Sequence, residues 1–193
     1  MGLTLQSLGF VGNQDKGHSY LPGVLIHEDP VQVNLEDGAE WDLGYYKVRE
    51  LAQYEISGRV LGRQNYWFGK ESEISPMDLA LGWQGMSDQS NLDQIKFGYA
   101  SRFFSWRTNS PEMSPEFINT HSSNIHIVPA NPEVKEALNH VQLGDLVRLQ
   151  GALVEVRGGD GWYWKSSLSR NDSGNGACEL MWVTGVEHLD QRI

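Results

Sequence analysis

Two polar stretches of the sequence contain most of the groups that could support chemistry. Residues 121–126 begin and end with a histidine, and residues 166–179 combine serines, an arginine, acidic residues and the chain's one cysteine. Imidazole, carboxylate and thiol groups are the usual metal ligands, acids and bases, and nucleophiles of enzymes. We therefore expect any catalytic site to draw on these two stretches.

A metal site would use His121, His126 and Asp172. Two imidazoles and a carboxylate suit a zinc or iron site that keeps an open position. The five-residue spacing of the histidines, however, matches neither HExxH nor another standard ligand pair. In the alternative interpretation, His126 hydrogen-bonds across a sheet and His121 caps the end of a helix. On balance, the sequence predicts no metal and no other cofactor.

A second catalytic hypothesis is a hydrolase with Cys178 or Ser167 as the nucleophile. Cys178 is followed by Glu179, and His121 and His126 are available as acid or base groups, which is the combination that activates a thiol. The alternative is that Cys178 begins an apolar strand and acts as a small buried hydrophobic residue.

The loop at residues 169–176 and the tryptophans are candidates for ligand binding. A polar ligand could be held by hydroxyl groups and glycine N–H groups of the loop and by Ser169, Arg170 and Asp172, with Asn124 nearby. The loop lacks the Gly-Lys-Ser/Thr ending of a phosphate-binding P-loop. An ordinary hairpin loop is the alternative. Trp162 and Trp164 lie on one face of a predicted strand and either stack on sugars or bases, or pack into the core.

The composition excludes several classes of protein. The 193 residues carry 15 basic and 25 acidic side chains, a net charge of −10, which argues against binding of double-stranded nucleic acid. Binding of a single strand would need a local basic groove, formed by Arg148, Arg157, Lys165 and Arg170. No apolar run approaches the roughly 18 residues of a membrane span, and a single cysteine excludes an internal disulfide. A mean hydropathy of −0.44 is typical of a soluble globular chain.

Strand patterns dominate the elements that would position these groups. The 21 glycines and the many aromatic residues favour short strands, tight turns and bulges. Alternating or apolar patterns predict strands over 54–61, 99–107, 123–128, 146–157, 162–168 and 178–183, with a bulge or bend at Gly58 and a kink at Gly151. Residues 1–21 are expected to form a flexible arm, and residues 22–193 one compact domain.

Short helices are expected between these strands. Ser75-Pro76, Ser114-Pro115 and Asn131-Pro132 each place a capping side chain before a proline, which is the usual beginning of a helix. The last of these precedes apolar residues at helical spacing, and Gly144 follows it. The predicted fold is therefore mainly β (α+β), a small curved, OB-like barrel with several short helices inserted.

Five stretches, taken together, resemble a family of bacterial proteins with no assigned activity. They are 54–68 (YEISGRVLGRQNYWF), 74–83 (ISPMDLALGW), 121–130 (HSSNIHIVPA), 144–156 (GDLVRLQGALVEV) and 166–180 (SSLSRNDSGNGACEL). The resemblance covers residues 22–183 and departs after Trp83, where the family has glycine directly. It implies the soluble part of a membrane-anchored or periplasmic protein, from which an N-terminal anchor was either removed or lost, and it implies no activity.

The leading hypothesis is therefore a non-enzymatic binding or accessory module near the bacterial cell envelope. Its partner would be a protein or a small polar ligand, held by exposed aromatic side chains and the 169–176 loop. The alternative is the hydrolase, metal-dependent or not, built on His121 and His126 with Asp172, Cys178 or Glu179. The sequence does not determine the oligomeric state.

Overall fold

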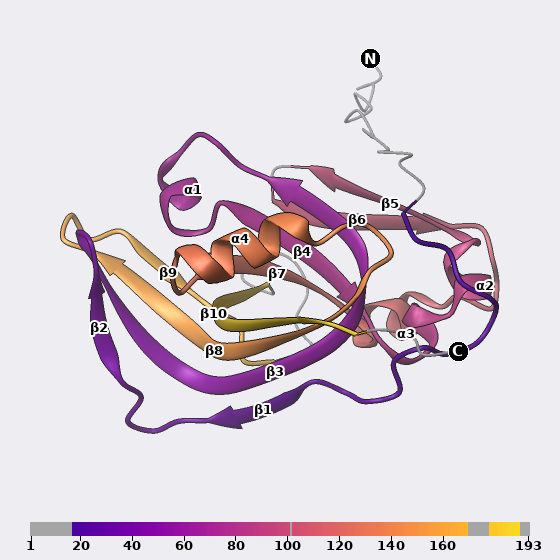
Figure 1. Ribbon diagram of the computed structural model, residues 1–193, viewed down its shortest axis with the longest axis horizontal. Helices are drawn as coiled ribbons and strands as arrows, with labels where there is room; N and C mark the ends of the chain where they lie inside the picture. Colours follow the sequence, from indigo (N-terminus) through magenta and orange to yellow (C-terminus); the bar gives the residue numbers. More distant parts are fainter. Residues whose placement is uncertain (1–16, 101, 170–177, 190–193) are drawn as a thin grey trace, which may run out of the picture.

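Strands are the main regular structure in residues 17–100, 102–169 and 178–189, which the computed structural model describes (Figure 1). Eight strands form one curved sheet, and two more form a separate hairpin. The sheet contains β1 (Val31–Asn34), β2 (Glu40–Leu43), β3 (Tyr46–Asn65), β4 (Met77–Gly82), β7 (Ser122–Pro129), β8 (Leu146–Gly158), β9 (Tyr163–Lys165) and β10 (Glu179–His188). The prediction of a mainly β fold is confirmed.

The order of pairing explains how this sheet curves. β3, β4, β7, β10 and β8 are neighbours in that order, and β8 also pairs with β3, from Tyr46 opposite Gly158 to Arg59 opposite Leu146. β7 and β10 run parallel, whereas the other pairs are antiparallel. The register of β3 shifts once against β8, near residue 51, and once against β4, near residue 61. Such bulges bend a strand and increase its twist.

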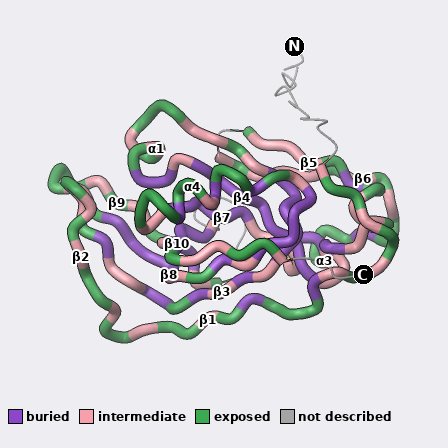
Figure 2. The backbone as a smooth tube through the Cα atoms, viewed as in Figure 1, coloured by how far each residue is buried: buried purple, intermediate pink, exposed green. Residues whose placement is uncertain are grey.

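The main hydrophobic core joins the sheet to helix α4 (Pro132–His140). Buried apolar residues from β3, β4, β7, β8 and β10 form one cluster, which Val134 and Leu138 of the helix complete. Figure 2 shows the buried positions concentrated along these central strands and the exposed ones along β1 and β2. The predicted cap is confirmed, because Asn131 Oδ1 accepts a hydrogen bond of 2.8 Å from Val134 N. The helix ends at His140, before the expected Gly144.

One predicted helix is wrong, because the segment after Ser75-Pro76 forms strand β4. All six residues of β4 are buried, since the strand is covered on both faces. A short apolar run buried on two faces has no alternation, so periodicity cannot distinguish it from a helix. This error matters for the site, because it places the side chain of Asp78 on a sheet.

The predicted strand over residues 99–107 is also wrong, because this segment turns back on itself. β5 (Ile95–Ala100) and β6 (Phe103–Thr108) form a hairpin in which Ala100 lies opposite Phe103. Arg102, in the turn, has a φ of 66°, in the left-handed region. No Asn-Gly or Asp-Gly pair marks the turn, so the usual sequence signal of a tight hairpin is missing.

Short helices and turns fill the long connection between β4 and β7. It contains η1 (Gln84–Ser87), α2 (Gln89–Leu92), the β5–β6 hairpin and α3 (Pro115–Thr120), and the remaining helix, α1 (Lys70–Ile74), precedes β4. The predicted cap of α3 is confirmed, because Ser114 Oγ accepts from Phe117 N. No helix in the described residues is both long and apolar enough to cross a membrane.

Two glycines allow close approaches that other residues would block. A Cβ at Gly151 would lie 1.9 Å from the carbonyl oxygen of Trp182 on the neighbouring strand β10. A Cβ at Gly58 would lie 2.8 Å from Cβ of Leu81. The register of β3 shifts near residues 51 and 61 and not at Gly58, so of the predicted bulge or bend the bulge is absent there, and Gly58 allows β3 to lie close to β4.

The ends of the predicted elements also differ from the structure. The predicted strand 162–168 is shorter, with β9 covering only Tyr163–Lys165, whereas β10 continues to His188. Most of the predicted arm, 1–21, lies outside the described residues. Its described end is bonded to the domain, because His18 N donates to Leu143 O and His18 Nδ1 lies 2.9 Å from Asp145 Oδ1.

Candidate functional site

A carboxylate and an imidazole face each other across two neighbouring strands. The antiparallel register of β4 and β7 places Asp78 opposite His126. Alternate residues of a strand point to opposite faces, so both side chains lie on the face away from Leu79 and Ile127 of the main core. Asp78 Oδ1 lies 2.7 Å from His126 Nδ1, and the side chain of Asp78 has no exposed surface.

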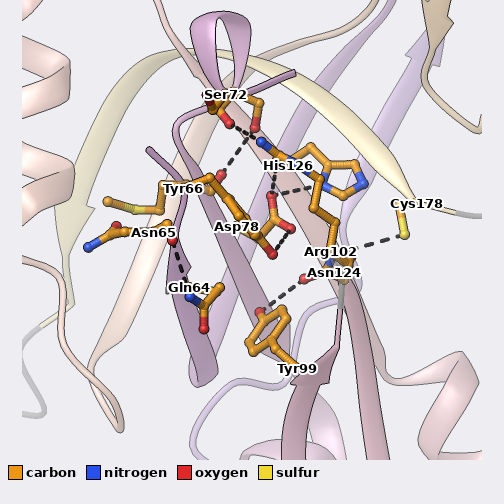
Figure 3. A network of polar contacts seen from close by, with 12 residues as sticks. Gln64, Asn65, Tyr66, Ser72, Asp78, Tyr99, Arg102, Asn124, His126 and Cys178 are labelled. Carbon is orange, nitrogen blue, oxygen red and sulfur yellow. Dashed lines mark hydrogen bonds and ion pairs between the residues drawn. The ribbon is translucent and has the colours of Figure 1, made fainter. Parts of the chain in front are cut away.

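Arg102 covers this pair from the turn of the β5–β6 hairpin. Its NH1 lies 3.3 Å from Asp78 Oδ1, and its NH2 donates to the carbonyl of Ser75 at 2.9 Å (Figure 3). The guanidinium carbon lies 3.8 Å from the ring centre of Tyr66, whose hydroxyl donates to Asp78 Oδ2 at 2.9 Å. The buried carboxylate therefore has a partner on each oxygen, as a buried charge requires.

A second branch of the network connects Asn124 to the thiol. Tyr99 OH donates to Asn124 Oδ1 at 3.0 Å. The Asn124 Nδ2 group donates to the carbonyl of Arg102 at 3.2 Å and lies 3.9 Å from Cys178 Sγ. Figure 3 shows Cys178 and Asp78 on opposite sides of the His126 ring. Residues from β4, β7, the hairpin and the beginning of β10 thus meet in one cluster.

The contacts within the cluster shift the pKa values of several of its side chains. Burial lowers the pKa of His126, but hydrogen bonds to Asp78 and Cys178 and their charges more than offset this, and the pKa rises to about 9. Burial, followed by the charge of Asp78, raises the pKa of Tyr66 and of Tyr99. His126 is consequently an imidazolium at neutral pH, and both tyrosines keep their protons.

The two histidines of the proposed metal site have separate roles. His121 follows α3, and its Nδ1 lies 2.8 Å from the carbonyl of Phe117, whereas His126 is bonded to Asp78. No cluster of metal-binding side chains occurs in the described residues, and Asp172 lies outside them. These contacts agree with the alternative in which His121 caps a helix and His126 bonds across the sheet.

The remaining catalytic candidates are distributed around the beginning of β10. Cys178 is partly exposed and lies in the cluster just described. Glu179 is buried and accepts a hydrogen bond from Ser123 Oγ, which fixes it to β7. Ser167 is buried, and its hydroxyl donates to the carbonyl of Ser169 at 2.9 Å. Of the predicted catalytic residues, His126 and Cys178 meet in the cluster, and Ser167 N donates to the carbonyl of Cys178 at 3.2 Å.

The ligand-binding candidates of the C-terminal region are only partly described. Arg170 and Asp172 lie outside the described residues, and Ser169 N is bonded to Ser167 Oγ at 3.0 Å. Trp164 packs on the imidazole of His126, with ring centres 4.9 Å apart.

The indole of Trp162 is half-buried against neighbouring side chains. Its ring centre lies 5.7 Å from that of Tyr46, and Lys70 Nζ lies 5.2 Å from it. These contacts favour a packing role for the Trp162 indole.

Sequence reasoning missed Asp78 and Arg102, which hold the cluster together. The helix predicted after Ser75-Pro76 would place Asp78 in its first turn, and the strand predicted over 99–107 would place Arg102 within it. A signal for Asp78 was present, because an acidic residue inside an apolar run such as 77–82 needs a buried partner. No comparable signal marks Arg102.

A groove of about 650 Å³ lies elsewhere, on the outer side of the curved sheet. Strands β1, β2, β3, β8 and β10 line it, and the indoles of Trp41 and Trp182 meet in it edge to face, with centres 5.0 Å apart. On β1, Val31 and Val33 are 59% and 52% exposed. No local sequence pattern indicates this groove, because it forms only when β1 and β2 pair with β3.

Polar groups alternate with the apolar ones along this groove. Glu50, Gln53, Glu55, Gln150 and Thr184 contribute to its lining. Gln150 Nε2 donates to Glu55 Oε2 at 2.7 Å, which orients both side chains. No basic side chain lines the groove in the described part of the chain.

One buried donor at the groove has no hydrogen-bond partner in the described residues. It is the Nε1 atom of Trp41. A buried donor of this kind normally has a protein, water or ligand partner.

Comparisons of the chain with known protein families, with curated proteins and with solved structures found no match. The resemblance to a bacterial family therefore remains a prediction, and the function has to be argued from the geometry of the network and the groove.

Proposed function

We propose that the chain is a binding module that holds an uncharged oligosaccharide in the groove formed by β1, β2, β3, β8 and β10. The observation that carries this proposal is the pair of indoles, Trp41 and Trp182, meeting in a groove of about 650 Å³. Ligand sites of this size typically combine aromatic walls with a few oriented polar groups.

The strand order supports an OB-like barrel as the framework of this module. In chain order, the five strands of this framework are β3, β4, β7, β8 and β10, and helix α4 lies between the third and the fourth. In the sheet they pair in the order first, second, third, fifth and fourth, and the fourth strand, β8, pairs again with the first, β3. OB-folds bind oligosaccharides and oligonucleotides, usually on the second and third strands. Here that face carries the Asp78–His126 network under the β5–β6 hairpin, so the ligand is assigned to the open groove instead.

The groove chemistry favours a sugar over other ligands. The faces of indole rings pack against the apolar faces of pyranose rings, while carboxylate and amide groups such as Glu50, Gln53 and Gln150 bond to hydroxyl groups. The orphaned Nε1 of Trp41 supplies one further donor. A glycan ligand also fits the envelope location that the bacterial resemblance implies.

A nucleic-acid ligand is disfavoured because two of the basic residues that would have to bind its phosphates are already paired with carboxylates. Arg148 is paired with Glu187 at 2.9 Å, and Arg157 lies 2.5 Å from Glu155. With these charges neutralised and a net charge of −10, the described residues that line the groove offer no basic path for phosphates.

Isothermal titration with chitohexaose, cellohexaose and maltohexaose tests the proposal. We expect at least one of them to bind the wild-type chain. Trp182→Ala should weaken that binding at least about tenfold, since it removes one stacking surface. Trp67→Ala is the matched control, because Trp67 is 79% exposed and lines a different cavity.

Two results would contradict the proposal. One is the absence of binding of all three oligosaccharides at millimolar concentration by the folded wild-type chain. The other is binding that Trp67→Ala abolishes and Trp182→Ala leaves unchanged. Binding of a single-stranded oligonucleotide with higher affinity than any oligosaccharide would instead support a function in binding single-stranded nucleic acid.

A further inference from the structure

The network beneath the hairpin contains a thiol, an imidazole and a carboxylate in series, and the oligosaccharide groove does not use them. Asp78 Oδ1 lies 2.7 Å from His126 Nδ1, which leaves the other ring nitrogen, Nε2, free of the carboxylate. Cys178 lies on the side of the same imidazole that faces away from Asp78 (Figure 3). A nucleophile next to a base that a third group orients is the recognisable arrangement of covalent catalysis.

We propose that Cys178 is an acyl-accepting nucleophile, with His126 as its acid–base partner and Asp78 as the residue that positions His126. The substrate class is an activated acyl compound, an ester or a thioester. Cys178 is partly exposed, so a small acyl group can reach the sulfur, whereas the side chains of Asp78 and His126 are 0% and 7% exposed.

The chemistry takes place in two balanced steps. In the first, the unprotonated form of His126, which predominates above about pH 9, takes the thiol proton at Nε2 as Sγ bonds to the carbonyl carbon, and the alcohol or thiol leaves with that proton. In the second, water adds to the S-acyl carbon and gives its proton to His126. The carboxylic acid leaves, and the proton returns to Sγ, so one ester and one water yield one acid and one alcohol.

Asn124 is placed to assist the first step. Its Nδ2 carries two hydrogens, of which one is directed to the carbonyl of Arg102, 3.2 Å away. The same nitrogen lies 3.9 Å from Cys178 Sγ. A donor so close to the nucleophile can stabilise the negative charge that develops on a carbonyl oxygen.

The charged and titratable groups around His126 come from every neighbouring element. Asp78 lies on β4, Arg102 in the hairpin turn, Tyr66 after β3 and Cys178 before β10, and Trp164 of β9 covers the ring. The Asp78 carboxylate and the Arg102 guanidinium offset each other, and Tyr66 donates its proton to Asp78. Cys178 and His126 are consequently the pair left to exchange a proton.

Acetylation by p-nitrophenyl acetate tests this proposal on the whole chain. Peptide mapping by mass spectrometry should find the acetyl group on Cys178, and Cys178→Ser should abolish thiol acetylation. The rate for the wild-type chain should exceed that of N-acetylcysteine at the same pH by about 100-fold, the usual contribution of a positioned base. The rate should rise with pH and level off above about 9, the pKa of His126.

The variant His126→Gln should lose this advantage, and its rate should then follow the pH in the same way as that of N-acetylcysteine. His140→Gln is the matched control, because His140 lies on α4 with its side chain 71% exposed. If His126→Gln does not fold, the comparison of the wild-type chain with N-acetylcysteine still decides. Acetylation confined to lysines, a Cys178 rate no higher than that of N-acetylcysteine, or equal rates in folded His126→Gln and wild type would overturn the proposal.

The proposal does not depend on the oligosaccharide groove. Trp182→Ala should leave acetylation of Cys178 unchanged, since the indole of Trp182 lines the groove and packs against Trp41. Failure of either proposal therefore leaves the other intact.

Discussion

The antiparallel register of β4 and β7 makes Asp78 and His126 partners, because it places them directly opposite each other. Asp78 Oδ1 lies 2.7 Å from His126 Nδ1. A shift by one residue would turn every side chain of a strand to the other face. The apolar residues of both strands, including Leu79 and Ile127, are fixed in the main core, so the core also fixes this polar pair.

Asp78→Asn should lower the pKa of His126. In the wild-type chain the hydrogen bond and the charge of Asp78 help raise this pKa to about 9, against the effect of burial. Without them, burial is opposed only by Cys178, and we expect the pKa to fall by at least about 2 units. Titration of the His126 ring proton signals by NMR measures both values, and an unchanged pKa in Asp78→Asn would show that the carboxylate does not hold the imidazolium.

The stability of the chain should fall as the pH rises from 6.5 to about 9. The pKa of His126 is higher in the folded chain than its ordinary value of 6.5, so its contribution is fully present below pH 6.5 and is lost by about pH 9. A shift of this size corresponds to roughly 3 kcal/mol. Urea unfolding at pH 6 and pH 9.5 measures it, and His126→Gln, which lacks the titrating group, should show a change smaller by that amount.

Arg102→Ala should loosen the β5–β6 hairpin and destabilise the fold. The change leaves the buried carboxylate of Asp78 without its guanidinium partner, which costs about 3 kcal/mol in comparable buried pairs. Hydrogen exchange should accelerate in β6. Lys96→Ala, at an exposed position of the same hairpin, is the control and should change stability by less than about 0.5 kcal/mol. Equal exchange rates in Arg102→Ala and wild type would argue against the anchoring role.

Gly151→Ala should destabilise the chain by at least about 2 kcal/mol. Its Cβ would lie 1.9 Å from the carbonyl oxygen of Trp182, a backbone atom that can move only with the strand. Gly159→Ala provides the matched control, since a Cβ at Gly159 meets nothing within 4 Å. Thermal unfolding compares the two variants, and equal melting temperatures would mean that β8 and β10 do not approach each other so closely.

Much of the framework was predictable because its signals are local. The caps at Ser114 and Asn131 and the apolar runs of β7, β8 and β10 depend on residues close together in the sequence. The same cap signature failed at Ser75-Pro76, where both faces of the following segment are covered by distant parts of the chain. Local signals thus predict elements well only where tertiary contacts do not override them.

The site was predicted only in part because its contacts join distant residues. His126 and Cys178 were candidates, but the partner that orients His126 lies 48 residues earlier in the chain. Trp41 and Trp182, which meet in the groove, come from opposite ends of the domain. Such pairings depend on the register and curvature of the sheet, which no local pattern contains.

The most direct test of the proposed function follows the indole N–H signals of the tryptophans by NMR during titration with the best-binding hexasaccharide. The account predicts that the signals of Trp41 and Trp182 shift in a saturable way, while that of Trp67 stays in place. Saturable shifts confined to Trp67, or no shift of Trp41 and Trp182 with any of the three oligosaccharides, would contradict the assignment of the groove as the binding site.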